Sequence, residues 1–414
     1  KSMKTINVNE RSYKWPSAPT VVVCIDGSEP DYIEQAVADG VMPYTRDMLK
    51  RGADLRADCV VPSFTNPNNL SIVTGRPPVV HGISGNYFLD PDSGNEVMMN
   101  DPRFLRVPTI LKAFQDEGAR ICIITAKDKL RALLGHGLRF GQDGAICFSS
   151  EKAGQANIAD NGIDGVVDTV GMPVPDVYSA ELSEFVFAAA VKLMQSQRPD
   201  IMYLSTTDYI QHKFAPGSAG ANAFYAMMDG YWNQLDDAGA VLALTADHGM
   251  NAKHDASGAP DVIYLQDALD KWLGASSARV ILPITDPYVV HHGALGSFAT
   301  AYLPDGADTN DILAKIRALS GVEYAEDCAT ACARFELPQD RLGDIVVVST
   351  RNKVIGTSAK NHDLSGLDVP LRSHGGISEQ AVPLIISRSL DSDAARSGLR
   401  NFDAFDLALN HVHA

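Results

Sequence analysis

Three short clusters of aspartate and histidine, far apart in the chain, carry residue types that bind metal ions. They comprise Asp208 with His212, Asp247 with His248, and His374. Carboxylate oxygens and imidazole nitrogens are ligands that suit zinc. A single histidine is more often structural than metal-binding. Three clusters of the same ligand types together favour a hydrolase with metal ions at its centre.

The spacing within two of these clusters predicts how they could hold a metal. Asp208 and His212 are four residues apart, so they share one face if a helix begins near Asp208. Asp247 and His248 are adjacent, and neighbours in a regular strand point to opposite faces. Both can reach one metal only from a loop beyond a strand end, where Gly249 would permit a turn.

Thr65 is the candidate nucleophile. It lies in the segment 61–75, where Pro67 suits the first turn of a helix, so we expect Thr65 just before that helix. The free amide groups at a helix N-terminus favour an anion such as phosphate. A threonine hydroxyl needs a nearby metal ion or base before it can attack. Without a metal nearby, Thr65 would be only an N-terminal helix cap.

Short apolar runs that end in polar residues predict the sheet that must position these groups. The runs are 21–25, 120–125, 201–204 and 241–245. Helical patterns precede them, which predicts an α/β fold: a mainly parallel central sheet with helices on both faces. Ligands of such sheets lie beyond the carboxyl ends of the strands. The residues that follow the runs, and that we expect to converge there, are Asp26, Lys127, Asp208 and Asp247.

The pattern of apolar residues changes between about 255 and 360. We predict a smaller α+β cap insertion at 255–360, over a catalytic core formed by 17–254 and 361–414. His291 and His292 lie in this cap and match no ligand pattern, so we leave them out of the site. The acidic residues of the cap are likewise treated as structural.

Composition excludes some classes of partner. The formal net charge of −16 and a pI near 5.0 argue against nucleic-acid or anionic-membrane binding, because either needs a positive field. No apolar run approaches the roughly 20 residues that span a bilayer, and the first residues form no apolar signal core. The six cysteines are interpreted as reduced thiols. We therefore expect a cytoplasmic enzyme with a small-molecule substrate, and a homodimer is compatible with the sequence.

These motifs resemble those of the alkaline phosphatase superfamily, and within it the nucleotide pyrophosphatase/phosphodiesterase branch. They stand in the family's order over about 350 residues: Asp26-Gly27, Pro62-Ser-Phe-Thr65, Ser71-Ile-Val-Thr-Gly75, Pro78 to Asn86, Asp208-x-x-x-His212, Thr245-Ala-Asp-His-Gly249 and Ser373-His-Gly375. The Cys-x-Pro-x-Arg signature of sulfatases and the Asp-Ser-Ala motif of phosphomonoesterases are both absent from the sequence.

The resemblance implies two zinc ions and assigns their ligands. One zinc would be held by Asp208, His212 and His374, and the other by Asp26, Asp247 and His248. It also implies that Thr65 is the nucleophile and binds the second zinc. The groups expected to contact the phosphoryl group of the substrate are Thr65, Asn86, His212 and His374.

Lys127 and Lys129 are the residues that distinguish between the possible substrate classes. Two lysines beside a dizinc centre would suit a compact substrate with a second anionic group. This cationic loop and the cap resemble those of the branch members that split the carbon–phosphorus bond of phosphonoacetate. The resemblance implies that the reaction passes through a phosphothreonine, which in this chain would form at Thr65. The alternative is a phosphodiesterase or nucleotide pyrophosphatase with the same metal centre. A metal- or phosphate-binding protein without activity is the third candidate.

Overall fold

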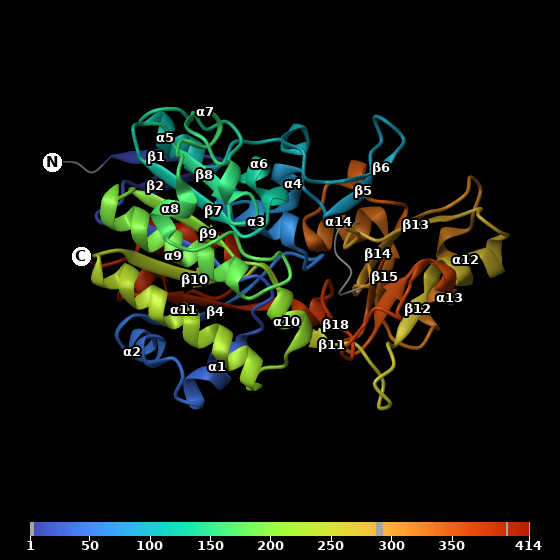
Figure 1. Cartoon of the computed structure of the whole chain (residues 1–414). Coiled ribbons are helices and arrows are strands. Elements are labelled where there is room, and N and C mark those ends of the chain that lie inside the picture. Colours follow the sequence, from blue (N-terminus) through green and yellow to red (C-terminus); the bar gives the residue numbers. More distant parts are fainter. Residues whose placement is uncertain (1–3, 287–292, 395, 414) are drawn as a thin grey trace.

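The apolar runs predicted as buried strands pair in one seven-stranded sheet (Figure 1). Its strands are β4 (Ala53–Asp58), β19 (Ala381–Ile386), β10 (Val241–Thr245), β3 (Thr20–Cys24), β9 (Ile201–Ser205), β7 (Ile121–Thr125) and β8 (Ile146–Ser149), in that spatial order. From β10 to β8 all neighbours are parallel, whereas β19 runs antiparallel to β10 and β4. The sheet is mixed but mainly parallel, which confirms the predicted fold class.

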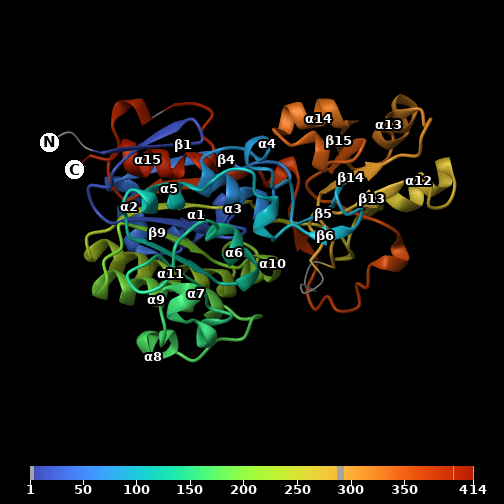
Figure 2. The ribbon, with the colours of Figure 1, turned by 90° about the horizontal axis from the view of Figure 1, so that it is seen from above.

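Helices cover both faces of this sheet, as Figure 2 shows. Val21 and Val23 of β3 enter one hydrophobic core and Val22 enters another, the pattern of a strand buried on both sides. The helices on one face are α1 (Pro30–Ala38), α2 (Pro43–Arg51), α9 (Glu181–Ser196) and α11 (Ala219–Asp237). Those on the other are α5 (Ile110–Asp116), α6 (Arg131–Leu134) and α15 (Ala404–Asn410).

A smaller lobe lies beside the large sheet (Figure 1). Its own sheet consists of β13 (Arg279–Ile281), β14 (Phe298–Tyr302), β16 (Ile345–Ser349) and β15 (Val322–Asp327), in that order. Its helices are α12 (Leu265–Leu273), α13 (Thr309–Arg317) and α14 (Cys328–Phe335). Because all these elements fall inside the predicted cap, we propose to keep the cap at 255–360 and the core at 17–254 and 361–414.

Two segments of the core domain pack against the cap. The hairpin of β5 (Tyr87–Leu89) and β6 (Glu96–Met98) contacts β13. Val61 and Phe64, which precede the candidate nucleophile, are buried in the hydrophobic core of the cap. The segment that carries Thr65 therefore contacts the cap as well as the core domain.

Shorter elements complete the fold. They are β1 (Thr5–Val8), β2 (Arg11–Lys14), α3 (Thr65–Thr74), α4 (Pro78–His81), α7 (Ile158–Asn161), α8 (Val166–Val170), α10 (Tyr209–Lys213), β11 (Asn251–Ala252), β12 (Val262–Tyr264), β17 (Val354–Gly356) and β18 (Arg372–Ser373). β11 pairs with β18, which brings the loops after 248 and before 374 side by side.

The structure is a computed structural model, and it describes every residue except 1–3, 287–292, 395 and 414. His291 and His292 therefore lie outside the described residues. Within the described part of the chain, no helix has the length and apolar character needed to traverse a bilayer. All six cysteines are free thiols, as expected, and all but Cys328 are buried.

Candidate active site

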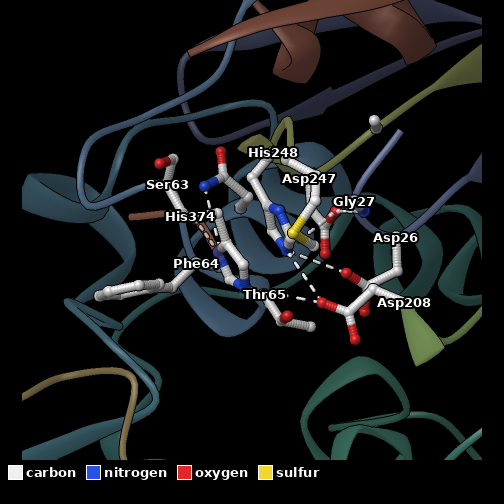
Figure 3. Close-up of polar contacts among 12 residues, drawn as sticks. Asp26, Gly27, Ser63, Phe64, Thr65, Asp208, Asp247, His248 and His374 are labelled. Atoms are coloured by element: carbon white, nitrogen blue, oxygen red, sulfur yellow. Dashed lines mark hydrogen bonds and ion pairs between the residues drawn. The ribbon is translucent and has the colours of Figure 1, made fainter. Parts of the chain in front are cut away.

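The predicted metal ligands meet in one buried cluster at the carboxyl ends of the central strands (Figure 3). They come from the loops that follow β3, β9, β10 and β18, and from α10, which carries His212. The residues that the fold brings together are Asp26, Asp208, His212, Asp247, His248 and His374. Loops at strand ends thus place side chains from distant parts of the sequence within reach of one another.

One group of ligand atoms comes from Asp208, His212 and His374. The Asp208 Oδ2 lies 2.9 Å from the His212 Nε2 and 3.6 Å from the His374 Nε2. Asp208 is the residue immediately before α10, so it and His212 share one helix face as the spacing predicted. This group matches the ligand set expected for the first zinc.

A second group comes from Asp26, His248 and again Asp208. The His248 Nε2 lies 2.9 Å from the Asp26 Oδ1 and 3.8 Å from the Asp208 Oδ2. The Asp247 Oδ1 is 3.6 Å from the same nitrogen and accepts a hydrogen bond from the Gly27 N–H at 3.1 Å. Asp247 thus borders this group, while Asp208 lies between the two groups.

Backbone carbonyls orient the three histidines of the cluster. Each Nδ1 lies 2.7 Å from a carbonyl oxygen. The pairs are His212 with Arg372, His248 with Gly249, and His374 with Ser63. Since a carbonyl accepts, each Nδ1 carries a proton, and Nε2, which faces the carboxylates, is the ring nitrogen left to bind a cation. This second layer of contacts is the arrangement typical of metal-binding histidines.

The electrostatics of the cluster favour a bound cation. Burial raises the pKa of Asp26 well above its usual value, and the neighbouring Asp208 and Asp247 raise it further. Burial lowers the pKa of His248, but Asp247, Asp26 and Asp208 outweigh it and raise that pKa to about 10. The buried Asp26 Oδ1 and His248 Nε2 face each other at 2.9 Å. Residues of these types in this geometry fit divalent zinc.

Thr65 is the first residue of α3 rather than the residue before it, because Phe64 occupies the N-cap position. The Phe64 ring is fully buried, 6.4 Å from the Phe298 ring of the cap and 5.5 Å from the His374 ring. No side-chain bond caps α3, so Thr65 does not act as a helix cap. Its side chain instead lines the pocket beside the carboxylates.

Ser63 joins the Thr65 segment to the loop that carries His374. The Ser63 hydroxyl donates to the Gly376 carbonyl and accepts from the Gly375 N–H, both at 2.9 Å. Gly375 has a φ of 121°, and a Cβ there would lie 2.4 Å from the Phe64 ring. Only glycine fits this position, so the segment that carries Thr65 and the loop that carries His374 are in direct contact.

Gly249, which we expected to permit a turn, also allows close packing. It does not belong to the described glycines with positive φ. A Cβ at this position would lie 1.9 Å from the Glu29 Oε2. Glu29 accepts the Met250 N–H at 3.1 Å, so the absence of a side chain at Gly249 lets this carboxylate reach the backbone.

A pocket opens onto the cluster. Besides Asp26, Asp208 and His374, it is lined by Thr65, Asn86, Lys127, Lys129 and Asp286. The Asn86 Oδ1 accepts a hydrogen bond from the Asn66 N–H at 2.9 Å. Since the oxygen is held in this way, the amide NH₂ of Asn86 is the group that can donate into the pocket.

The two predicted lysines enter this pocket from the loop that follows β7. Burial lowers the pKa of Lys127, and the neighbouring Lys129 lowers it further. The Lys129 ammonium pairs with the buried carboxylate of Asp286. Sequence reasoning missed Asp286, because it lies in the cap and no motif marks it. It also missed Thr206, whose hydroxyl accepts the Asp26 N–H at 2.9 Å.

Known proteins resemble the whole chain. The profile of the family described as type I phosphodiesterase / nucleotide pyrophosphatase matches residues 20–376. Two crystal structures of phosphonoacetate hydrolase from Sinorhizobium meliloti 1021 share 60% sequence identity with this chain. One is a complex with phosphonoformate and the other a complex with phosphonoacetate. Each similarity covers 99% of this chain and 99% of that chain, with a TM-score of 0.96.

Shorter stretches resemble two curated proteins. An uncharacterized pyrophosphatase/phosphodiesterase of Schizosaccharomyces pombe is 30% identical over 115 residues, which is 27% of this chain and 22% of that protein. A phosphonoacetate hydrolase of Penicillium oxalicum is 68% identical over 31 residues, 7% of this chain and 43% of that protein. The chain thus spans less than half the length of these curated relatives.

Proposed function

Because the chain belongs to the type I phosphodiesterase / nucleotide pyrophosphatase family, and is a hydrolase that acts on phosphorus compounds, we propose that its substrate is phosphonoacetate. The products would be acetate and phosphate. One observation carries the proposal: Lys127 and Lys129 share a pocket with Thr65 and the aspartate–histidine cluster. A compact substrate could place its phosphonate against Thr65 and its carboxylate against the lysines.

We propose that two zinc ions complete the site. The first would be held by Asp208, His212 and His374, and the second by Asp26, Thr65, Asp247 and His248. When bound, they lower the pKa of a hydroxyl or water and neutralise the negative charge of the group being transferred. The orientation of the histidines and the clustered carboxylates support this assignment.

In the first half of the reaction, the Thr65 hydroxyl loses its proton to solvent, and its oxygen attacks phosphorus in line with the carbon–phosphorus bond. That bond breaks, and its electron pair passes to the methylene carbon and into the adjacent carboxylate. The ammonium groups of Lys127 and Lys129 stabilise the charge that develops there. The Asn86 amide donates to a phosphoryl oxygen, and His212 and His374 border the same group. A proton from solvent then converts the carbanion to acetate.

In the second half, water attacks the phosphothreonine. The bond between the Thr65 oxygen and phosphorus breaks, the threonine hydroxyl is restored and phosphate leaves. The first turn of α3 favours this anionic group, because its backbone amides point toward the N-terminus of the helix.

Product release from two substrates tests the proposal. Purified protein supplied with zinc should release equal amounts of acetate and phosphate from phosphonoacetate. Bis-p-nitrophenyl phosphate should be a much poorer substrate, because it offers no carboxylate to the lysines. Absence of phosphate release from phosphonoacetate would refute the proposal, and efficient cleavage of the diester would favour a phosphodiesterase.

We also propose a cytoplasmic location. The six free thiols support a reducing compartment. The net charge of −16 supports a small-molecule substrate instead of a nucleic acid or a membrane surface. Fractionation of the source cells with a zinc-dependent assay would test the location.

A further inference from the structure

A fully buried ion pair lies behind the aspartate–histidine cluster. The Lys253 Nζ is 3.0 Å from the Glu379 Oε2, and both side chains are 0% exposed. Burial lowers the pKa of Lys253, and the Glu379 carboxylate opposes that change. Removing two charges from water is unfavourable, so a buried ion pair contributes little to the net stability of the fold. A pair in this position therefore calls for a role other than stabilising the fold.

Glu379 contacts both loops that carry ligand histidines. Its Oε2 accepts from the Asn251 Nδ2 at 2.6 Å and from the Ser378 hydroxyl at 2.5 Å. Its Oε1 accepts from the Gly376 N–H at 3.2 Å, and its backbone carbonyl accepts from the Gly249 N–H at 2.8 Å. Gly249 directly follows His248, so one glutamate joins the two loops through side chain and backbone.

Lys253 also links the two loops that carry His248 and His374. It follows β11, which pairs with β18, and its N–H donates to the Leu371 carbonyl at 2.9 Å. Lys253 stands five residues after His248, and Glu379 stands five residues after His374. The ion pair thus lies where the two ligand loops run side by side.

We propose that Lys253 and Glu379 are positioning residues for the metal centre. This inference rests on the proposed function, because it concerns the zinc ligands named there. The pair and its hydrogen bonds fix the loops on which His248 and His374 stand, and thereby the orientation of both Nε2 atoms. Partners of metal ligands that do not touch the metal themselves commonly change metal affinity by 10–100-fold when removed.

Zinc affinity of the Glu379→Gln variant tests the proposal. Competition with a chromogenic chelator should show zinc binding weakened by about 10–100-fold relative to wild type. At saturating zinc, KM for phosphonoacetate should remain close to the wild-type value while kcat falls, because Glu379 does not line the substrate pocket. If Glu379→Gln does not fold, the double variant Lys253→Met, Glu379→Gln carries the same test without a buried unpaired charge.

Asp236→Asn is the matched control. Asp236 pairs with Arg388 at 3.1 Å, and neither residue belongs to the metal cluster. This variant should lower the midpoint of thermal unfolding without changing zinc affinity. Zinc affinity of Glu379→Gln or of the double variant within twofold of wild type would overturn the inference. A wild-type protein that binds no zinc would refute the proposed function itself, and the positioning role with it.

Discussion

The imidazole rings of His248 and His374 lie parallel, with centroids 3.5 Å apart and 6° between their planes. Their Nε2 atoms are 3.8 Å and 3.6 Å from the same Asp208 oxygen. The fold therefore directs two imidazole nitrogens and a carboxylate at one small volume. Asp26 and Asp247 add two more carboxylates close by. Without a cation these carboxylates repel one another, so the site should depend on metal for stability as well as for activity.

Removal of metal should both inactivate and destabilise the protein. Binding of zinc to the folded chain alone would add about 2.7 kcal/mol per site at a free concentration 100 times the Kd. We expect chelator-treated protein to unfold at a lower temperature and to regain its unfolding midpoint and activity with zinc. Thermal unfolding with and without added zinc checks this. An unchanged midpoint with full activity after complete metal removal would contradict it.

Thr65→Ala should abolish turnover of phosphonoacetate, with a loss of about 10³-fold or more, because it removes the proposed nucleophile. Circular dichroism should show an unchanged fold, since the Thr65 hydroxyl caps no helix. Thr74→Ala on the same helix is the control, because the Thr74 hydroxyl bonds the Leu70 carbonyl instead of facing the pocket. Activity that persists in Thr65→Ala would mean that water attacks phosphorus directly.

Lys127→Ala and Lys129→Ala should each weaken kcat/KM for phosphonoacetate more than for an ester with an uncharged leaving group. A hydrogen bond to a charged group contributes about 1.5–3 kcal/mol, so the loss should be about 10- to 150-fold. Lys152→Ala, an exposed lysine outside the pocket, should behave as wild type. Equal losses for both substrates would argue against carboxylate recognition.

The core fold was open to prediction because it depends on local signals. Apolar runs ending in polar residues marked β3, β9 and β10, and ligands after the ends of parallel strands had to converge at one edge. The fold class drawn from these signals is confirmed, and so is the family resemblance, which rested on the motifs. The reversed direction of β19 was not predictable, because an apolar run such as 381–386 reads the same in either direction.

Contacts between distant segments could not be read from the sequence. No sequence motif near Asp286 predicts that it contacts Lys129, because the pair forms only when the cap packs on the core. The same holds for Phe64, which packs against Phe298 of the cap and occupies the N-cap position, so that Thr65 is the first helical residue. Tertiary packing, in both cases, decided what helix and strand signals left open.

Asp286→Asn should make the pocket bind anions more tightly. Asp286 neutralises the Lys129 ammonium, so its loss adds one positive charge to the lining of the pocket. We expect the inhibition constant for phosphonoformate to fall by roughly fivefold, equivalent to about 1 kcal/mol for a partly exposed pair. Asp261→Asn, which breaks the cap ion pair with Lys353 outside the pocket, is the control. Unchanged inhibition would show that Asp286 does not tune the pocket.

His81 should make the stability of the protein depend on pH. It is fully buried, its Nδ1 accepts the Ile83 N–H at 3.1 Å, and its Nε2 lies 2.8 Å from the Ser71 hydroxyl. Burial, with a smaller effect of Arg341, lowers its pKa from 6.5 to about 3. Between these values the unfolded chain binds a proton that the folded chain does not, so the free energy of unfolding decreases as the pH falls.

His81→Gln should therefore reduce this pH dependence by up to about 1.36 kcal/mol per pH unit between pH 6 and pH 4. At pH 7 the variant should already be less stable, by about 1–3 kcal/mol, because buried hydrogen bonds are lost. Urea denaturation of chelator-treated protein at several pH values separates the two effects, since metal release no longer contributes. The exposed His136→Gln provides the control, and an unchanged slope in His81→Gln would show that His81 does not bind the proton taken up on unfolding.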